Sequence, residues 1–245
     1  MPTDKELEAY YHSFNEDYHG GGRAKGAKKR QNRYAEKYLK IVNEYSYGKL
    51  LIDIGSSNNP FPNIAKKCGY SVTVVDYVKP KELLSDISFI PSRIEDLMSI
   101  KLQFDVVTAF AIIEHTKDPI LALKNLIKLS KVNGIIIIYI PEIGEFPDKF
   151  SLGTSKWLFP PEHLNLISKK ALVELMEREN CILSHYERFE LNLLRFIIRY
   201  SIGFFEGVIG FMFRFLFGEK IWEDVRFKRK SLYTGLSMFV FMRVK

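Results

Sequence analysis

Cysteine is scarce in this chain of 245 residues, which contains only Cys68 and Cys181. Two cysteines imply neither a disulfide framework nor a zinc site, so we expect a reducing, cytoplasmic setting. The first 20 residues contain no apolar stretch, and we therefore expect no secretory signal peptide there. No uncharged run approaches the roughly 18 apolar residues of a membrane-spanning helix. The length suits one large α/β domain with a modest appendage.

Acidic residues are lacking from one short segment. Lysine and arginine total 36 against 29 aspartates and glutamates, and residues 22–33 hold six basic residues and no acid. A second basic cluster lies at 226–230. Either cluster could bind nucleic acid, an anionic membrane or a phosphate-bearing substrate, and either could simply keep the surface solvated. The net charge of +7 therefore leaves the partner open, with nucleic acid the less favoured choice.

Strand-like and helix-like segments alternate along the chain, which predicts a doubly wound, mostly parallel sheet. The seven expected strands are 49–54, 71–77, 87–90, 104–110, 132–141, 182–189 and 236–245. The expected helices are 4–12, 28–45, one opened by Pro60, 118–130 and 169–179. We expect a helical or flexible segment at 1–30 and one domain at 31–245, which includes an apolar helical insertion at 191–230. Sheets of this kind bind ligands beyond the carboxyl ends of their strands.

The stretch "LLIDIGSSNNPF" (50–61) ends a buried strand and turns on small residues. A dinucleotide loop usually needs three glycines, but here Gly55 stands alone and Ser57 and Asn59 occupy the other places. S-adenosylmethionine carries no phosphate, so a tight turn suffices for it. Asp76 ends the next strand and can accept hydrogen bonds from both ribose hydroxyls. Both cofactor classes use such an acid, so this stretch alone does not separate them.

Four motifs in order make the distinction: "DIGSSNN" (53–59), "FDVVTAFAIIEHTKDP" (104–119), "LSKVNGIIIIYIPE" (129–142) and "EHLNLISKKALVELMERENC" (162–181). Across about residues 30–190 the sequence resembles the class I S-adenosylmethionine-dependent methyltransferases of the broad small-molecule group. The resemblance implies a seven-stranded Rossmann-like methyltransferase fold, S-adenosylmethionine as the cofactor and methyl transfer as the reaction.

The resemblance also implies roles for the matching positions. The methionine end of the cofactor would be shaped by Asp53, Gly55 and Ser57, the ribose held by Asp76, the adenine flanked by Tyr77, Ile94 and Glu95, and the methyl-donor pocket lined by Ala109 and Phe110. Arg93 stands where the family often has an acid that contacts the adenine amine. Two motif glycines are also lost, although a small polar residue can form the turn, since Asn tolerates positive φ.

An oxygen acceptor must lose its proton during methyl transfer. The candidate bases are His115, His163, Glu142 and Tyr139. We expect no metal, although Glu114, His115 and His163 could supply three ligands for a divalent ion. Some relatives have a further acid at the position of Ala111. Each residue also has a structural interpretation, since Asp53 could cap its turn and Glu114 and His115 could cap the segment that follows.

The apolar stretch at 191–222 has four interpretations: a substrate lid, a homodimer interface, a helix on a membrane surface, or a core helix pair. We predict a cytoplasmic methyltransferase and leave association with a membrane open. Its acceptor is an oxygen atom of a small molecule, such as a sugar, a lipid-linked compound or an isoprenoid-type metabolite. The alternatives are an RNA or protein methyltransferase and a catalytically inactive cofactor-binding regulator or scaffold. A nicotinamide dehydrogenase is the least favoured.

Overall fold

The computed structural model describes Glu6 and residues 25–97, 100–143, 163–189 and 236–245. Outside these ranges lie, wholly or almost wholly, the predicted helix 4–12, the basic cluster 226–230 and the apolar segment 191–222. The expectations for these segments, including a homodimer interface or a membrane contact through 191–222, stay predictions. None of the described helices is both long and apolar enough to cross a membrane.

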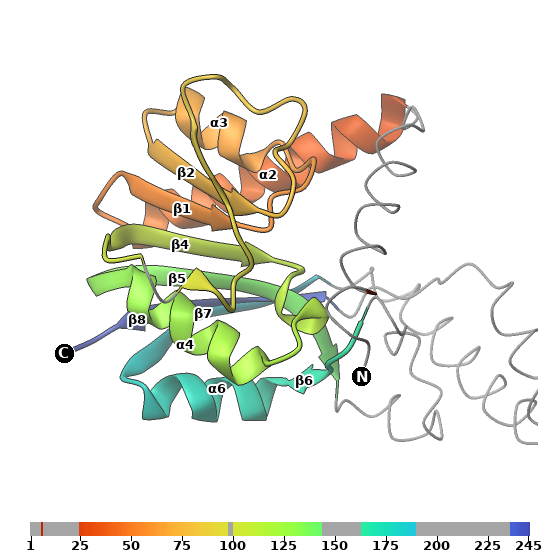
Figure 1. Cartoon of the computed structure of the whole chain (residues 1–245). Coiled ribbons are helices and arrows are strands. Elements are labelled where there is room, and N and C mark those ends of the chain that lie inside the picture. Colours follow the sequence, from red (N-terminus) through yellow and green to blue (C-terminus); the bar gives the residue numbers. More distant parts are fainter. Residues whose placement is uncertain (1–5, 7–24, 98–99, 144–162, 190–235) are drawn as a thin grey trace, which may run out of the picture.

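One mostly parallel sheet forms the centre of the domain (Figure 1). Its strands, in spatial order, are β3 (Ser88–Pro91), β2 (Ser71–Asp76), β1 (Leu50–Ile54), β4 (Phe104–Phe110), β5 (Ser130–Ile143), β8 (Leu236–Arg243) and β7 (Cys181–Phe189). The short strand β6 (Ile167–Ser168) pairs with the end of β5. Only β8 runs antiparallel, to both β5 and β7. The doubly wound sheet predicted from the sequence is therefore confirmed, with the strand order reversing between β1 and β4.

Helices cover both faces of this sheet. The described helices are α2 (Lys25–Tyr45), α3 (Phe61–Lys67), the 3-10 turn η2 (Ile113–His115), α4 (Pro119–Leu129) and α6 (Lys169–Arg178). Apolar residues of α2 and α3 form one buried cluster with alternate residues of the strands. Those of α4 and α6 form a second cluster on the opposite face (Figure 1). With both faces covered, only the strand ends are left to carry a site.

Short-range signals fix several helix ends. Asp118 caps α4 by accepting a hydrogen bond from the Leu121 backbone N–H at 2.9 Å, and Pro119 is the first helical residue. Pro60 directly precedes α3, as predicted. The predicted helix 118–130 ends one residue early, because Ser130 adopts an extended backbone and begins β5. The elements η2 and β6 were not predicted, since two or three residues carry no periodicity.

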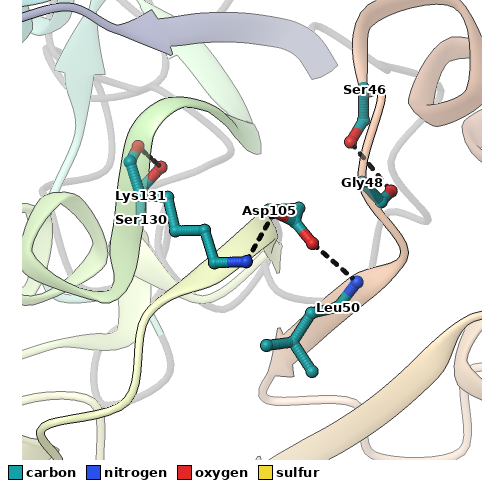
Figure 2. Close-up of polar contacts among 6 residues, drawn as sticks. All are labelled: Ser46, Gly48, Leu50, Asp105, Ser130 and Lys131. Carbon is teal, nitrogen blue, oxygen red and sulfur yellow. Dashed lines mark hydrogen bonds and ion pairs between the residues drawn. The ribbon is translucent and has the colours of Figure 1, made fainter.

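Polar contacts also join the amino ends of three neighbouring strands (Figure 2). The carboxylate of Asp105 accepts hydrogen bonds from the Leu50 backbone N–H at 2.9 Å and from Lys131 Nζ at 2.8 Å. A Cβ atom at Gly48 would lie 2.0 Å from Asp105 Cγ, so this approach requires glycine. Ser46 Oγ donates to the Gly48 carbonyl at 3.2 Å and closes the same turn (Figure 2). Asp105 thereby ties β1, β4 and β5 together at the edge away from the predicted site.

Candidate active site

The loop after β1 is a tight turn with two residues in the left-handed region. Gly55 has φ +70° and Ser57 has φ +45°. A Cβ atom at Gly55 would lie 1.9 Å from Ile112 Cδ1, so glycine is required by both conformation and space. A small polar residue forms the turn, as expected, and the residue with positive φ is Ser57 rather than an asparagine. Its conformation costs about 1 kcal/mol or more in a residue that carries a Cβ.

Asp76 connects this turn to the end of β2. Its Oδ2 accepts a hydrogen bond from the Ser57 backbone N–H and its Oδ1 accepts one from the Tyr77 backbone N–H, each at 2.7 Å. Each carboxylate oxygen has a second lone pair, and the side chain is only half-buried. Asp76 can therefore hold the turn and still accept hydrogen bonds from two neighbouring hydroxyl groups, which suits the ribose of a nucleoside.

Asp53 lies beneath the same turn. It is 1% exposed, and its two oxygens accept hydrogen bonds from Thr108 Oγ1 and Ser56 Oγ, each at 2.5 Å. Burial raises the pKa of Asp53 to about 7, against the opposing effect of the two hydroxyl donors, and the charge of Asp76 adds to the rise. The structure thus places Asp53 as a buried support of the loop, with no exposed surface for a ligand.

The loop after β3 is held by a residue of α4, on the sheet face opposite to α2 and α3, that the sequence reasoning missed. Asn125 of α4, which is 1% exposed, donates from Nδ2 to the carbonyls of Ile94 at 2.8 Å and Glu95 at 3.0 Å. Glu95 Oε1 accepts from the Lys117 backbone N–H at 3.1 Å. The available signal was a lone asparagine on the apolar face of the predicted helix 118–130. Ile94 itself is buried.

Arg93 and Tyr77 lie beside each other at the ends of β3 and β2. The guanidinium carbon of Arg93 lies 5.5 Å from the centroid of the Tyr77 ring, within the range of a cation–π contact. The Ser92 backbone N–H donates to the Asp76 carbonyl at 3.2 Å and joins the two loops. This edge therefore offers one aromatic ring and one cation next to Asp76.

The end of β4 packs into an aromatic cluster. The Phe110 ring stacks on Tyr38 of α2 at a centroid distance of 4.5 Å and meets the edge of Phe61 at 5.1 Å. Ala109 is fully buried and Phe110 is 9% exposed. The two residues predicted to line the donor pocket are thus buried at the end of the strand. No local sequence signal indicated that α2 would contribute Tyr38 here.

Tyr139 belongs to the same cluster and is poorly suited as a base. Burial raises the pKa of its phenol, and the neighbouring Tyr38 raises it further. The group therefore stays protonated near neutral pH. Its backbone carbonyl accepts from the Ala111 N–H at 2.7 Å, and Ala111 has φ +55°.

Glu142 lies near the end of β5, where its backbone pairs with Ile167, but its side chain is not among those described.

Glu114, His115 and His163 come together beyond β4. Their ligand atoms all lie within 4.8 Å of one another. The two imidazole rings meet edge to face, with centroids 4.8 Å apart. Glu114 is 3% exposed, and both histidines are half-buried. The structure therefore assembles three predicted site residues from two distant parts of the sequence.

Backbone hydrogen bonds hold the two parts of this cluster together. The Glu114 carbonyl accepts from the backbone N–H groups of Leu164 at 2.8 Å and Asn165 at 3.0 Å. The Asn165 side-chain amide also donates to the Thr116 carbonyl. The residue before Leu164 is His163, so these bonds fix the main chain on which that imidazole stands.

The family model described as "Methyltransferase domain" matches residues 27–185. The fold is shared with several solved structures. The Burkholderia thailandensis 1,6-didemethyltoxoflavin-N1-methyltransferase, solved with S-adenosylhomocysteine, is 14% identical with a TM-score of 0.61, covering 100% of this chain and 92% of that one. A SAM-dependent methyltransferase from Archaeoglobus fulgidus is 18% identical with a TM-score of 0.59, covering 95% and 99%. The [4+2]-cyclase SpnF is 15% identical with a TM-score of 0.59, covering 92% and 85%.

The family match and the fold place the chain among the class I S-adenosylmethionine-dependent methyltransferases. The chain belongs to the methyltransferase domain family, because the family model covers well over half of it. No curated protein matches the sequence. The cyclase among the structural neighbours shows that this fold alone does not decide the reaction.

Proposed function

We propose that the protein transfers the methyl group of S-adenosylmethionine to an oxygen atom of a small-molecule acceptor. One observation carries the proposal: the turn held by Asp76 and the cluster of Glu114, His115 and His163 both follow the carboxyl ends of strands β1, β2 and β4. The turn can hold a nucleoside, and the cluster can accept a proton from the acceptor. A nitrogen acceptor is the second candidate, because one structural neighbour is an N1-methyltransferase.

The residues at this edge fit the cofactor. Asp76 would accept hydrogen bonds from the ribose hydroxyls, and the turn at Gly55 and Ser57 would lie along the methionine end. Tyr77 and the backbone around Ile94 would contact the adenine. When bound, S-adenosylmethionine supplies a methyl group on a positively charged sulfur. What the chain must add is position and the exclusion of water, because proximity alone lowers the barrier by several kcal/mol, on the order of 7 in favourable cases.

Deprotonation of the acceptor oxygen falls to the cluster beyond β4. An imidazole changes its charge near neutral pH, which suits a group that accepts a proton during turnover. The buried carboxylate of Glu114 can stabilise the positive charge that an imidazole gains. His115 and His163 are therefore the candidates for this step, and Glu142 is a further one.

The cofactor half of the proposal is tested by calorimetry with S-adenosylmethionine and S-adenosylhomocysteine. We expect the native protein to bind both, and Asp76→Ala to lose at least ten-fold in affinity, because its carboxylate supports both the turn and the ribose. Asp86→Ala is the matched control. It removes an exposed carboxylate that pairs with Lys66 at 3.2 Å, away from the site. No binding by the native protein would favour the inactive scaffold.

The acceptor half is tested by incubating the protein with labelled methyl donor and pools of hydroxylated and amino compounds. Mass spectrometry of the product identifies the methylated atom. Product on oxygen supports the proposal, whereas product on nitrogen moves the assignment to the second candidate. Transfer to RNA or protein, with none to small molecules, would overturn the acceptor class.

A further inference from the structure

The cluster of Glu114, His115 and His163 has the chemistry of a transition-metal site. Two imidazole nitrogens and one carboxylate oxygen form a donor set that suits divalent iron, cobalt, nickel or zinc. The donor atoms lie within 4.8 Å of one another. Metal–ligand bonds of about 2.0–2.2 Å place donors of one ion about 3.3 Å apart. Small side-chain rotations therefore suffice to bring all three to a single ion.

The main chain around the cluster is fixed before any ligand arrives. The Glu114 carbonyl joins the two segments through Leu164 and Asn165, and Thr116 Oγ1 donates to the Ile113 carbonyl at 2.8 Å within the turn. A chance cluster on a mobile surface lacks such ties. Glu114 is also 3% exposed, and a divalent cation bound here would place a positive charge beside its buried carboxyl group.

We infer that Glu114, His115 and His163 bind one divalent transition-metal ion, which keeps an open coordination position for an oxygen atom of the acceptor. The choice of acceptor rests on the proposed function, but the metal site does not. Magnesium and calcium are disfavoured, because they prefer oxygen ligands throughout.

The inferred ion changes how the acceptor loses its proton. A hydroxyl bound to a divalent cation has a lowered pKa, so its proton passes to water and the histidines serve as ligands. The carbon–sulfur bond then breaks, the oxygen–carbon bond forms, and the sulfur leaves as a neutral thioether. No oxidant or reductant is required.

The direct test is titration of the chelator-treated full-length protein with Co²⁺, followed by its visible absorption, and with Zn²⁺ by calorimetry, both without cofactor or acceptor. We expect one ion per chain. Glu114→Gln, His115→Ala and His163→Ala should each weaken binding at least ten-fold. His185→Gln is the matched control, because His185 is a half-buried histidine of β7 whose Nδ1 lies 3.3 Å from Tyr45 Oη.

The possible outcomes separate this inference from the proposed function. Folding of each variant is checked by its thermal unfolding transition, and Glu114→Gln keeps the shape of the buried side chain. Binding that is absent in the native protein, or equal in native and His163→Ala, would overturn the metal site. S-adenosylhomocysteine affinity is measured separately. Cofactor binding without metal binding would support the proposed function and overturn the metal site. Metal binding without cofactor binding would support the metal site and overturn the proposed function.

Discussion

Two aspartates on neighbouring strands, Asp53 of β1 and Asp105 of β4, lie at opposite edges of the sheet and differ in burial, hydrogen-bond partners and pKa. Asp105, at the amino ends, meets a lysine and a backbone N–H. Although partial burial opposes the shift, these hydrogen bonds hold the pKa of Asp105 below its ordinary value. Asp53, at the carboxyl ends, is enclosed with two hydroxyl groups and has a pKa raised by burial to about 7.

The contrast separates an edge that stabilises the fold from one that carries the site. The charge of Asp105 is matched by Lys131, so the ionised carboxylate favours folding. The charge of Asp53 has only hydroxyl donors and lies near the carboxylate of Asp76, so ionisation of Asp53 opposes folding. A network that keeps an unfavourable group under a ligand-binding turn is typical of functional sites.

The largest expected effect is on the pH dependence of stability. The pKa of Asp53 rises from 3.8 to about 7 on folding, so between these values the folded chain binds more protons. The contribution of Asp53 to the free energy of unfolding is therefore complete below pH 4 and is lost as the pH rises through 7. The change amounts to roughly 4 kcal/mol. Asp53→Asn keeps hydrogen-bonding capacity but does not titrate.

Urea unfolding of both proteins from pH 4 to pH 8 measures this effect. The native curve should fall relative to the Asp53→Asn curve across that range, and the variant should be the more stable at pH 8. Parallel curves would mean that Asp53 is ionised throughout and would remove the contrast between the two aspartates.

The next effect concerns the amino ends. Asp105→Ala leaves the Leu50 N–H without its side-chain acceptor and removes the partner of Lys131. We expect a loss of about 1 kcal/mol in the free energy of unfolding, because an unsatisfied donor costs on the order of 1–3 kcal/mol when fully buried and the Leu50 N–H is only partly buried. The affinity for S-adenosylhomocysteine should stay within two-fold of native. A large drop in affinity, with the fold intact, would show that the two edges are not independent.

Sequence reasoning predicted much of the fold because the strands are strongly patterned. The apolar run 132–141 indicated a central strand, and β5 has that place between β4 and β8. Gly55 was identifiable because a strand end followed by small residues is a local signal, and Asp76 because it is the acid that ends the next strand. The cluster of Glu114, His115 and His163 was named as a set, although only the fold shows that these side chains meet.

The remaining features depend on packing across long separations. That Asp53 is sealed beneath its turn follows from Thr108 on the neighbouring strand, which no local pattern connects to it. Tyr38 reaches Phe110 only because α2 crosses the sheet. Asn125 likewise finds its partners on the loop after β3. Each of these contacts is tertiary, so the sequence on its own left them undetermined.

The smallest effect tests where strain is located. At the amino edge the residues with positive φ are Gly69, Asn133 and Asn180, which tolerate it, whereas the carboxyl edge places Ser57 and Ala111 in that region beside Gly55. Strained positions of this kind concentrate at functional sites.

Replacing the strained alanine with glycine should therefore stabilise the protein slightly. Ala111→Gly relieves a left-handed conformation at φ +55°, which costs about 1 kcal/mol or more with a Cβ present. The greater freedom of glycine in the unfolded chain offsets part of the gain, leaving about 0.5 kcal/mol. Ala109→Gly is the control, since Ala109 is fully buried in β4 without positive φ and should lose stability. Equal losses in the two variants, measured by urea unfolding, would show that Ala111 is not strained and that the two edges differ only in charge.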